Sequence, residues 1–208
     1  MQVEPSTPWL TRCKPLAAAA LLSMSLAAAP GHAAEITLAD VKVPDTATVA
    51  GQTLKRNGAG IRYKAVFKVY VASLYLANDQ ADTPEKVLAA PGPKRLVLTL
   101  VRTVKSDELG KMFSRGIEDN MDPKEFSKLV PGVLRMGNIF SKYKSLGEGN
   151  TITVDWVPGK GMLVLVNGEQ EGDPFPEPAF FDSMMRIWLG KTPADFRLKD
   201  ALLGKGTT

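Results

Sequence analysis

Apolar residues along the chain form runs with the lengths and spacings of β-strands. The runs 67–76 (FKVYVASLYL) and 95–102 (RLVLTLVR) are apolar on both alternating sets of positions, which predicts central strands covered on both faces. The runs 151–157 and 162–166 predict two further strands, joined as a hairpin by a Pro-Gly-Lys-Gly turn. The mixed segment 36–49 predicts an edge strand and a loop. The sequence Gly58-Ala59-Gly60 predicts a bend before Arg62.

Helical spacing and capping residues predict a pair of helices between these strands. Ser106 is the expected N-cap of a helix running to about residue 121. The segment 122–125 (DPKE) has the cap, proline and glutamate that open a second helix. Pro131 should break or restart this helix before it continues to about residue 146.

Two more helices are expected at the carboxyl end, over residues 178–189 and 192–203. The elements therefore follow the order strands, helices, strands, helices, without a regular alternation of strand and helix. This order predicts an α+β domain with an antiparallel sheet rather than a doubly wound parallel one.

The first residues predict a secretory signal peptide. Arg12 and Lys14 precede an apolar run over 16–29, and small residues follow it, so we expect cleavage after Ala33 or Ala34. The apolar run is shorter than the roughly 20 residues that cross a bilayer. We therefore expect a periplasmic or secreted protein with no stable membrane anchor after cleavage.

The predicted mature domain, residues 34–208 after a leader over 1–33, would lack both histidine and cysteine. Cys13 and His32, the only residues of these types, lie in the leader. This excludes histidine-assisted nucleophiles, thiolates and disulfides in the mature protein, and we expect no metal site and no cofactor. The net charge of +4 for the whole chain is a mild excess, without a basic block interleaved with aromatics. We therefore expect no nucleic-acid partner.

Arg62 and Tyr70 are the polar residues that stand out in the strand-like part of the sequence. An arginine beside a central strand that carries a tyrosine could present a fork of N–H donors and a phenol O–H to one carboxylate or enolate. The alternative is that Arg62 pairs with a surface acid and Tyr70 only packs in the core.

Two strings of the sequence resemble a known family. The strings are GAGIRYKAVFKVYVASLYL, residues 58–76, and SMMRIWLGKTPADFRLKDALLG, residues 183–204. They resemble the chalcone isomerase superfamily, and within it the bacterial chalcone-isomerase-like branch. The resemblance implies an open-faced β-sandwich, in which helices are layered on one face of a large antiparallel sheet and a ligand cleft lies between them.

The same resemblance assigns expected roles to four residues. Arg62 matches the arginine of both the plant enzymes and the fatty-acid-binding members, and Tyr70 matches a tyrosine of the fatty-acid-binding members. Phe181 falls where the enzymes have a serine or threonine in the penultimate helix, and Asn120 is the residue whose type matches their middle-helix asparagine. These four residues are the expected ligand-binding set, and none is expected to be catalytic.

Three functions are compatible with these residues. We expect a non-catalytic protein that binds a small acidic or amphiphilic ligand, such as a fatty acid. The enzymatic alternative is an isomerase, an intramolecular lyase acting on a chalcone-like enone, in which Arg62 stabilises negative charge. The third is a structural or interaction protein with a vestigial cleft. The sequence leaves the ligand's identity and the oligomeric state open.

Overall fold

The computed structural model describes residues 1–2, 35–78 and 80–206 of the chain. The predicted cleavage after Ala33 or Ala34, and all but the first two residues of the predicted leader, lie outside these residues. In the described ranges no helix has the length and apolar character needed to span a bilayer.

Antiparallel strands form the centre of the domain, as the sequence predicts. The main sheet has seven strands in the order β11-β10-β9-β6-β5-β4-β3. Its strands are β3 (Thr46–Val49), β4 (Gln52–Lys64), β5 (Phe67–Leu76), β6 (Lys94–Leu100), β9 (Thr151–Val157), β10 (Gly161–Val166) and β11 (Glu169–Gln170). Two small sheets pair β1 (Ile36–Leu38) with β2 (Val41–Val43) and β7 (Val104–Lys105) with β8 (Ser145–Leu146). The α+β class is therefore confirmed.

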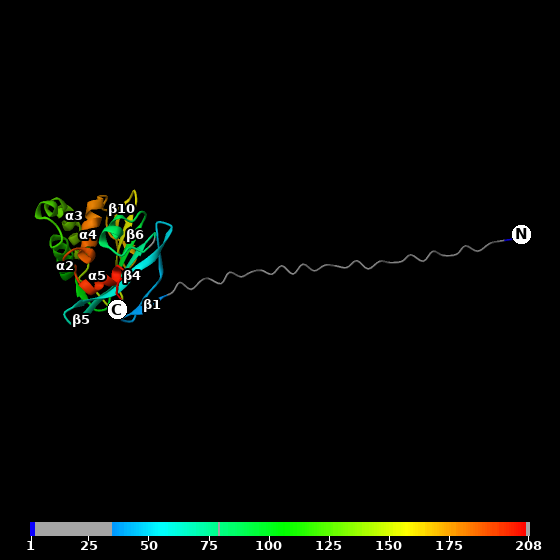
Figure 1. Ribbon diagram of the computed structural model, residues 1–208, viewed down its shortest axis with the longest axis horizontal. Helices are drawn as coiled ribbons and strands as arrows, with labels where there is room; N and C mark the ends of the chain where they lie inside the picture. Colours follow the sequence, from blue (N-terminus) through cyan, green and yellow to red (C-terminus); the bar gives the residue numbers. More distant parts are fainter. Residues whose placement is uncertain (3–34, 79, 207–208) are drawn as a thin grey trace. The chain divides into compact units, whose positions relative to one another are not determined.

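Helices cover one face of this sheet (Figure 1). They are α1 (Pro84–Ala89), α2 (Ser106–Glu118), α3 (Pro123–Ser141), α4 (Pro178–Leu189) and α5 (Phe196–Leu202). Alternate residues of β5, including Tyr70 and Leu74, are buried in the same apolar cluster as Phe113, Phe140 and Trp188 from the helices. The rings of Phe113 and Phe140 stack with centroids 5.0 Å apart, and this layer of side chains holds α2 and α3 together.

Tyr75, from the other alternate set of β5 residues, belongs to a smaller cluster on the opposite face. Tyr75 is buried there with Val49 and Leu54. Arg95 donates two hydrogen bonds, of 2.7 and 2.6 Å, to the carboxylate of Asp155 on the neighbouring strand. Burial on both faces explains why β5 is apolar at nearly every position.

Four details of the helix predictions are wrong. The last helix begins at Phe196 with Asp195 as its cap, and not at residue 192. Pro131 does not break the second helix, because α3 continues through it to Ser141. Pro131 lies on the exposed side of α3, where water can bond the carbonyl that the missing N–H leaves free. Ser106 is the first helical residue rather than the cap, which is Lys105. Leu146 belongs to β8, so the helix ends before it.

The glycines before Arg62 lie inside β4, although the Gly-Ala-Gly sequence suggests a bend. The pairing of β4 with β5 shifts register between Arg56 and Gly58. A Cβ atom at Gly58 would collide with the backbone of Ala201 and Leu202 in α5. Glycine is therefore needed here because α5 lies directly against the strand.

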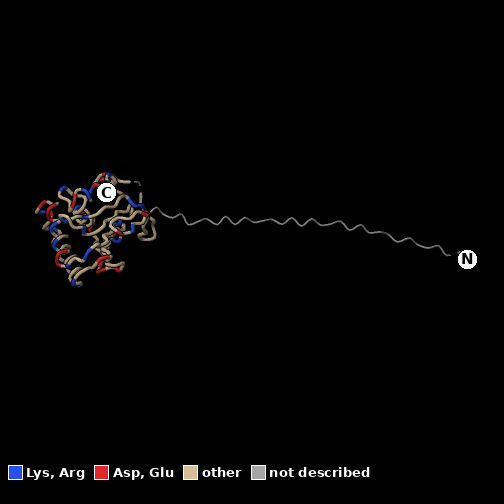
Figure 2. The backbone as a smooth tube through the Cα atoms, turned by 90° about the horizontal axis from the view of Figure 1, so that it is seen from below, with Lys and Arg blue, Asp and Glu red and all other residues tan. Residues whose placement is uncertain are grey.

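Both signs of charge are interspersed over the domain (Figure 2). Several of the ion pairs are local contacts on exposed helix surfaces, such as Lys111 with Asp107 and Lys128 with Glu125. Pairs of this kind contribute little to stability. The apolar clusters on the two faces of the sheet are therefore what hold the fold together.

Candidate functional site

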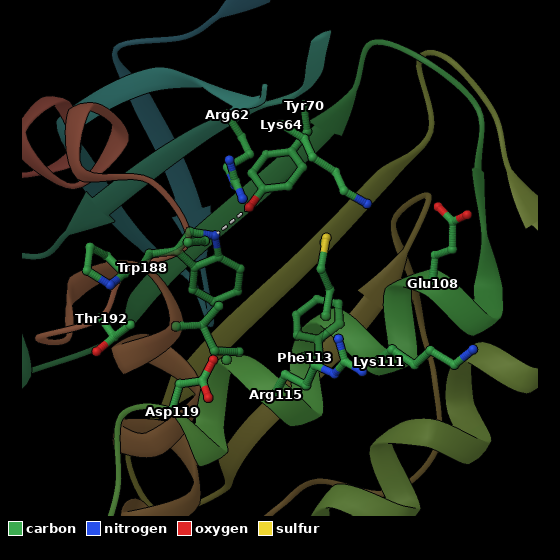
Figure 3. A pocket seen from close by; sticks show the side chains of 15 residues that line it. Arg62, Lys64, Tyr70, Glu108, Lys111, Phe113, Arg115, Asp119, Trp188 and Thr192 are labelled. Carbon is green, nitrogen blue, oxygen red and sulfur yellow. Dashed lines mark hydrogen bonds between the residues drawn. The ribbon is translucent and has the colours of Figure 1, made fainter. Parts of the chain in front are cut away.

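A β-bulge brings Arg62 and Tyr70 together at the edge of the helical layer. Arg62 of β4 lies directly opposite Tyr70 of β5, and the next pair along the strands is Tyr63 with Lys68. Val69 is the extra residue, so the ladder shifts register at this point. Directly opposed residues of antiparallel strands project from the same face of the sheet, and Figure 3 shows the Arg62 guanidinium beside the Tyr70 ring.

The Tyr70 phenol is buried and oriented by a tryptophan. Trp188 of α4 donates a hydrogen bond of 2.9 Å from Nε1 to the Tyr70 hydroxyl. The hydroxyl accepts this bond, so its own hydrogen is available for another acceptor. Burial raises the pKa of Tyr70 to about 12, against the opposing effects of the Trp188 bond and of Arg62. The phenol therefore stays protonated, and a donor, well above neutral pH.

Arg62 has donor capacity that its protein neighbours leave unused. Its Nη1 lies 3.7 Å from Oδ2 of Asp195, which is a charge contact but too long for a hydrogen bond. Its Nε is buried and has no hydrogen-bond partner among the residues that the structure describes. A buried donor of this kind is costly unless a ligand or water satisfies it.

The carboxylate of Asp195, in contrast, is well satisfied without Arg62. It accepts hydrogen bonds from the backbone N–H groups of Arg197 and Leu198, and so caps the start of α5. It also accepts a 3.1 Å bond from the N–H of Tyr63. Asp195 therefore fixes α5 to β4, and Arg62 is a neighbour of this junction rather than part of it.

A cavity of about 430 Å³ opens beside the pair (Figure 3). This volume is within the usual range for small-molecule pockets. One wall is the strand side, with Arg62, Lys64 and Tyr70, and the other is formed by α2, by the end of α4 and by the loop before α5. The lining residues from those parts are Glu108, Lys111, Met112, Phe113, Arg115, Gly116, Asp119, Ile187, Trp188, Thr192, Pro193 and Ala194.

Charge and burial divide this cavity into an apolar interior and a basic rim. Phe113, Ile187 and Trp188 are buried, whereas Lys64, Lys111 and Arg115 are exposed. The lining includes four basic and two acidic side chains, so its charge balance favours an anion. The cavity therefore combines an apolar contact surface with basic groups that can receive a negative charge.

Two of the four residues expected from the sequence do not line the cavity. The amide of Asn120 donates to the carbonyls of Gly116 and Thr192 and accepts a bond from the N–H of Thr192. It therefore ties the end of α2 to the loop after α4. Phe181 lies nearer the start of α4 than Trp188 does. Its ring centroid is 5.3 Å from that of Trp156 and 5.8 Å from the Lys94 ammonium nitrogen. It is the register of α4 that places Trp188, not Phe181, beside Tyr70.

The α2 side of the cavity is missed by the sequence interpretation, although a signal for it exists. Glu108, Met112, Arg115 and Asp119 recur at the three- and four-residue spacing of one helix face. Gly116 on the same face lets Ile187 approach, since a Cβ there would come 2.8 Å from Ile187 Cγ2. No group of three or more possible metal ligands occurs in the part of the chain described by the structure.

Comparison with known proteins identifies the family of this chain. A family model described as chalcone isomerase-like matches residues 34–204. The chain belongs to the chalcone isomerase-like family. The resemblance of residues 58–76 and 183–204 to the chalcone isomerase superfamily is thereby confirmed.

A solved structure supports the same chalcone isomerase-like fold. The fatty-acid binding protein AtFAP1 of Arabidopsis thaliana matches with a TM-score of 0.68 and 13% sequence identity, over 83% of this chain and 97% of that one. At this identity the match shows the common fold. None of the curated proteins compared with the chain is significantly similar to it in sequence.

Proposed function

We propose that this chalcone isomerase-like protein is an exported, non-catalytic binding protein for a small acidic amphiphile such as a fatty acid. The observation that carries the proposal is the unpartnered, buried Nε of Arg62 beside the Tyr70 phenol at the wall of an apolar cavity. A carboxylate would accept from both groups, while its apolar chain would contact Phe113, Ile187 and Trp188.

The protonation states of the two groups agree with this ligand. Arginine side chains are cationic donors in proteins, and the raised pKa of Tyr70 keeps the phenol a donor. A carboxylate is an acceptor when ionised and matches both. A binding role also agrees with the structural neighbour AtFAP1, which is a fatty-acid binding protein.

A binding titration with saturated fatty acids of increasing chain length tests the proposal. Arg62→Ala should weaken binding about 10- to 100-fold, because a charge-assisted contact is worth roughly 1.5–3 kcal/mol. Tyr70→Phe should weaken it a few-fold, since a neutral donor is worth about 0.5–1.5 kcal/mol. Arg186→Ala is the matched control, because Arg186 is an exposed arginine of α4 that does not line the cavity.

The proposal is supported if binding is saturable and if Arg62→Ala weakens it most, Tyr70→Phe less, and Arg186→Ala least. The absence of binding at every chain length, or equal losses in Arg62→Ala and Arg186→Ala, contradicts it. Export is tested separately, by cell fractionation and by the mass of the purified protein. A protein that begins after Ala33 or Ala34 is the expected result, and an uncleaved chain in the cytoplasm would contradict it.

A further inference from the structure

The tip of the β4–β5 hairpin exposes two adjacent apolar side chains. Val66 and Phe67 have exposed fractions of 82% and 60%. Single exposed apolar residues are common and need no explanation. These two are consecutive, and they lie within an entirely exposed stretch, residues 64–68.

The residues of this turn are not the ones that a two-residue hairpin turn favours. Lys64 pairs with Phe67, so Ala65 and Val66 form the turn, and Ala65 adopts a φ of 55°. Turns of this length favour Asn-Gly, which tolerates positive φ. The same chain uses that solution between β10 and β11, where Asn167 and Gly168 have φ values of 53° and 86°. The apolar turn at Ala65-Val66 therefore departs from what folding alone would favour.

Several basic residues lie in the two segments at this tip. The two segments that meet at this end of the sheet, residues 61–70 and 101–105, contain five basic and no acidic residues. They are joined by a hydrogen bond of 3.1 Å from Val101 N–H to the Val69 carbonyl. The Arg102 guanidinium lies 5.4 Å from the centroid of the Phe67 ring.

From these observations we infer that the β4–β5 hairpin docks the protein reversibly on an anionic phospholipid surface. Val66 and Phe67 would enter the boundary between headgroups and acyl chains, and Lys64, Lys68 and Arg102 would contact the lipid phosphates. The shape of the tip, apolar at its end with a basic collar, fits a charged bilayer surface. Lys64 also lines the cavity, so docking would bring the cavity mouth close to the membrane.

Docking does not depend on what the cavity binds, so it is tested without a ligand. The compact unit of residues 32–208 contains every core residue in the described part of the chain. It is used to keep the apolar segment of residues 16–29 out of the assay. Co-sedimentation is measured with vesicles of phosphatidylglycerol mixed with phosphatidylethanolamine, and with vesicles of phosphatidylcholine alone. We expect binding to the anionic vesicles that weakens as salt is added.

Paired variants identify the surface responsible. Val66→Ser combined with Phe67→Ser should weaken binding about 10-fold or more. Lys68→Gln combined with Arg102→Gln should weaken it by about fivefold per charge and reduce the salt dependence. Phe196→Ser is the matched apolar control, since Phe196 on α5 is 66% exposed. Lys160→Gln is the charge control, on the turn at the opposite end of the sheet.

Thermal melts confirm that each variant is folded, and an emission blue shift of a Phe67→Trp variant on anionic vesicles reports insertion of the tip. Equal binding to anionic and neutral vesicles, or no binding, would overturn the inference. Two further results would also overturn it. One is that the hairpin variants leave binding unchanged, and the other is that Phe196→Ser or Lys160→Gln weakens binding as much as the hairpin variants do.

Discussion

Replacing Arg62 should cost this protein little stability, and this separates an anchor from a structural arginine. The ion pair with Asp195 has an N–O distance of 3.7 Å, and the two side chains are 18% and 12% exposed. Because the Asp195 carboxylate accepts three backbone hydrogen bonds, Arg62→Ala removes its counter-charge but leaves it hydrogen-bonded. We expect a loss of about 0.2–1 kcal/mol, as for other partly exposed pairs.

Thermal unfolding followed by circular dichroism gives the measurement. For a domain of this size, 1 kcal/mol lowers Tm by about 2–4 °C, so Arg62→Ala should melt within about 4 °C of the wild type. A structural arginine paired with a buried acid would instead cost roughly 3–5 kcal/mol when removed. A Tm decrease of roughly 6 °C or more would therefore refute the assignment of Arg62 as a ligand anchor.

Asp195→Asn provides the matched variant. Asparagine is also a good N-cap, and its one amide oxygen can keep the bonds to the Arg197 and Leu198 N–H groups while the negative charge is removed. Its NH2 group then faces the Tyr63 N–H, which loses its acceptor. We expect a loss of about 1–3 kcal/mol of stability and a few-fold tighter binding of an acidic ligand, because the competing carboxylate is gone. Asp195→Ala removes the cap as well and should cost about 1 kcal/mol more.

The site supports three further predictions. Burial raises the folded-state pKa of Tyr70 from 10 to about 12. The protonated phenol therefore contributes stability that is complete below pH 10 and is lost as the pH rises toward 12. Alkaline denaturation should show a loss of roughly 2–3 kcal/mol in this window that Tyr70→Phe lacks. In thermal melts, Asn120→Ala should lower the free energy of unfolding by about 1–2 kcal/mol. In binding titrations, Asn120→Ala and Phe181→Leu should each leave ligand affinity within about twofold of the wild type. The protein should not measurably accelerate chalcone cyclisation, and a rate enhancement abolished by Arg62→Ala would contradict this.

The sequence determines the strands and helices because local spacing carries that information. β5 is buried on both faces, and the capping signal at Asp122 marks a true helix start, whereas the last helix begins after its Asp195 cap and not at residue 192. Errors occur where a local signal competes with solvent or packing. Pro131 is tolerated because it lies on the exposed side of α3, and Gly58 serves a close approach of α5 rather than a bend.

The sequence also indicates Arg62 and Tyr70, since a strand alternates its side chains predictably once its partner is known. The rest of the cavity depends on how elements distant in sequence pack against one another. Trp188 is 118 residues from the Tyr70 that it contacts, and only the rotation of α4 about its axis decides that Trp188, and not Phe181, faces that phenol. Asn120 and Thr192 are likewise joined by tertiary packing. Local periodicity fixes which residues share a face, whereas the pairing of faces is set by the tertiary packing of the core.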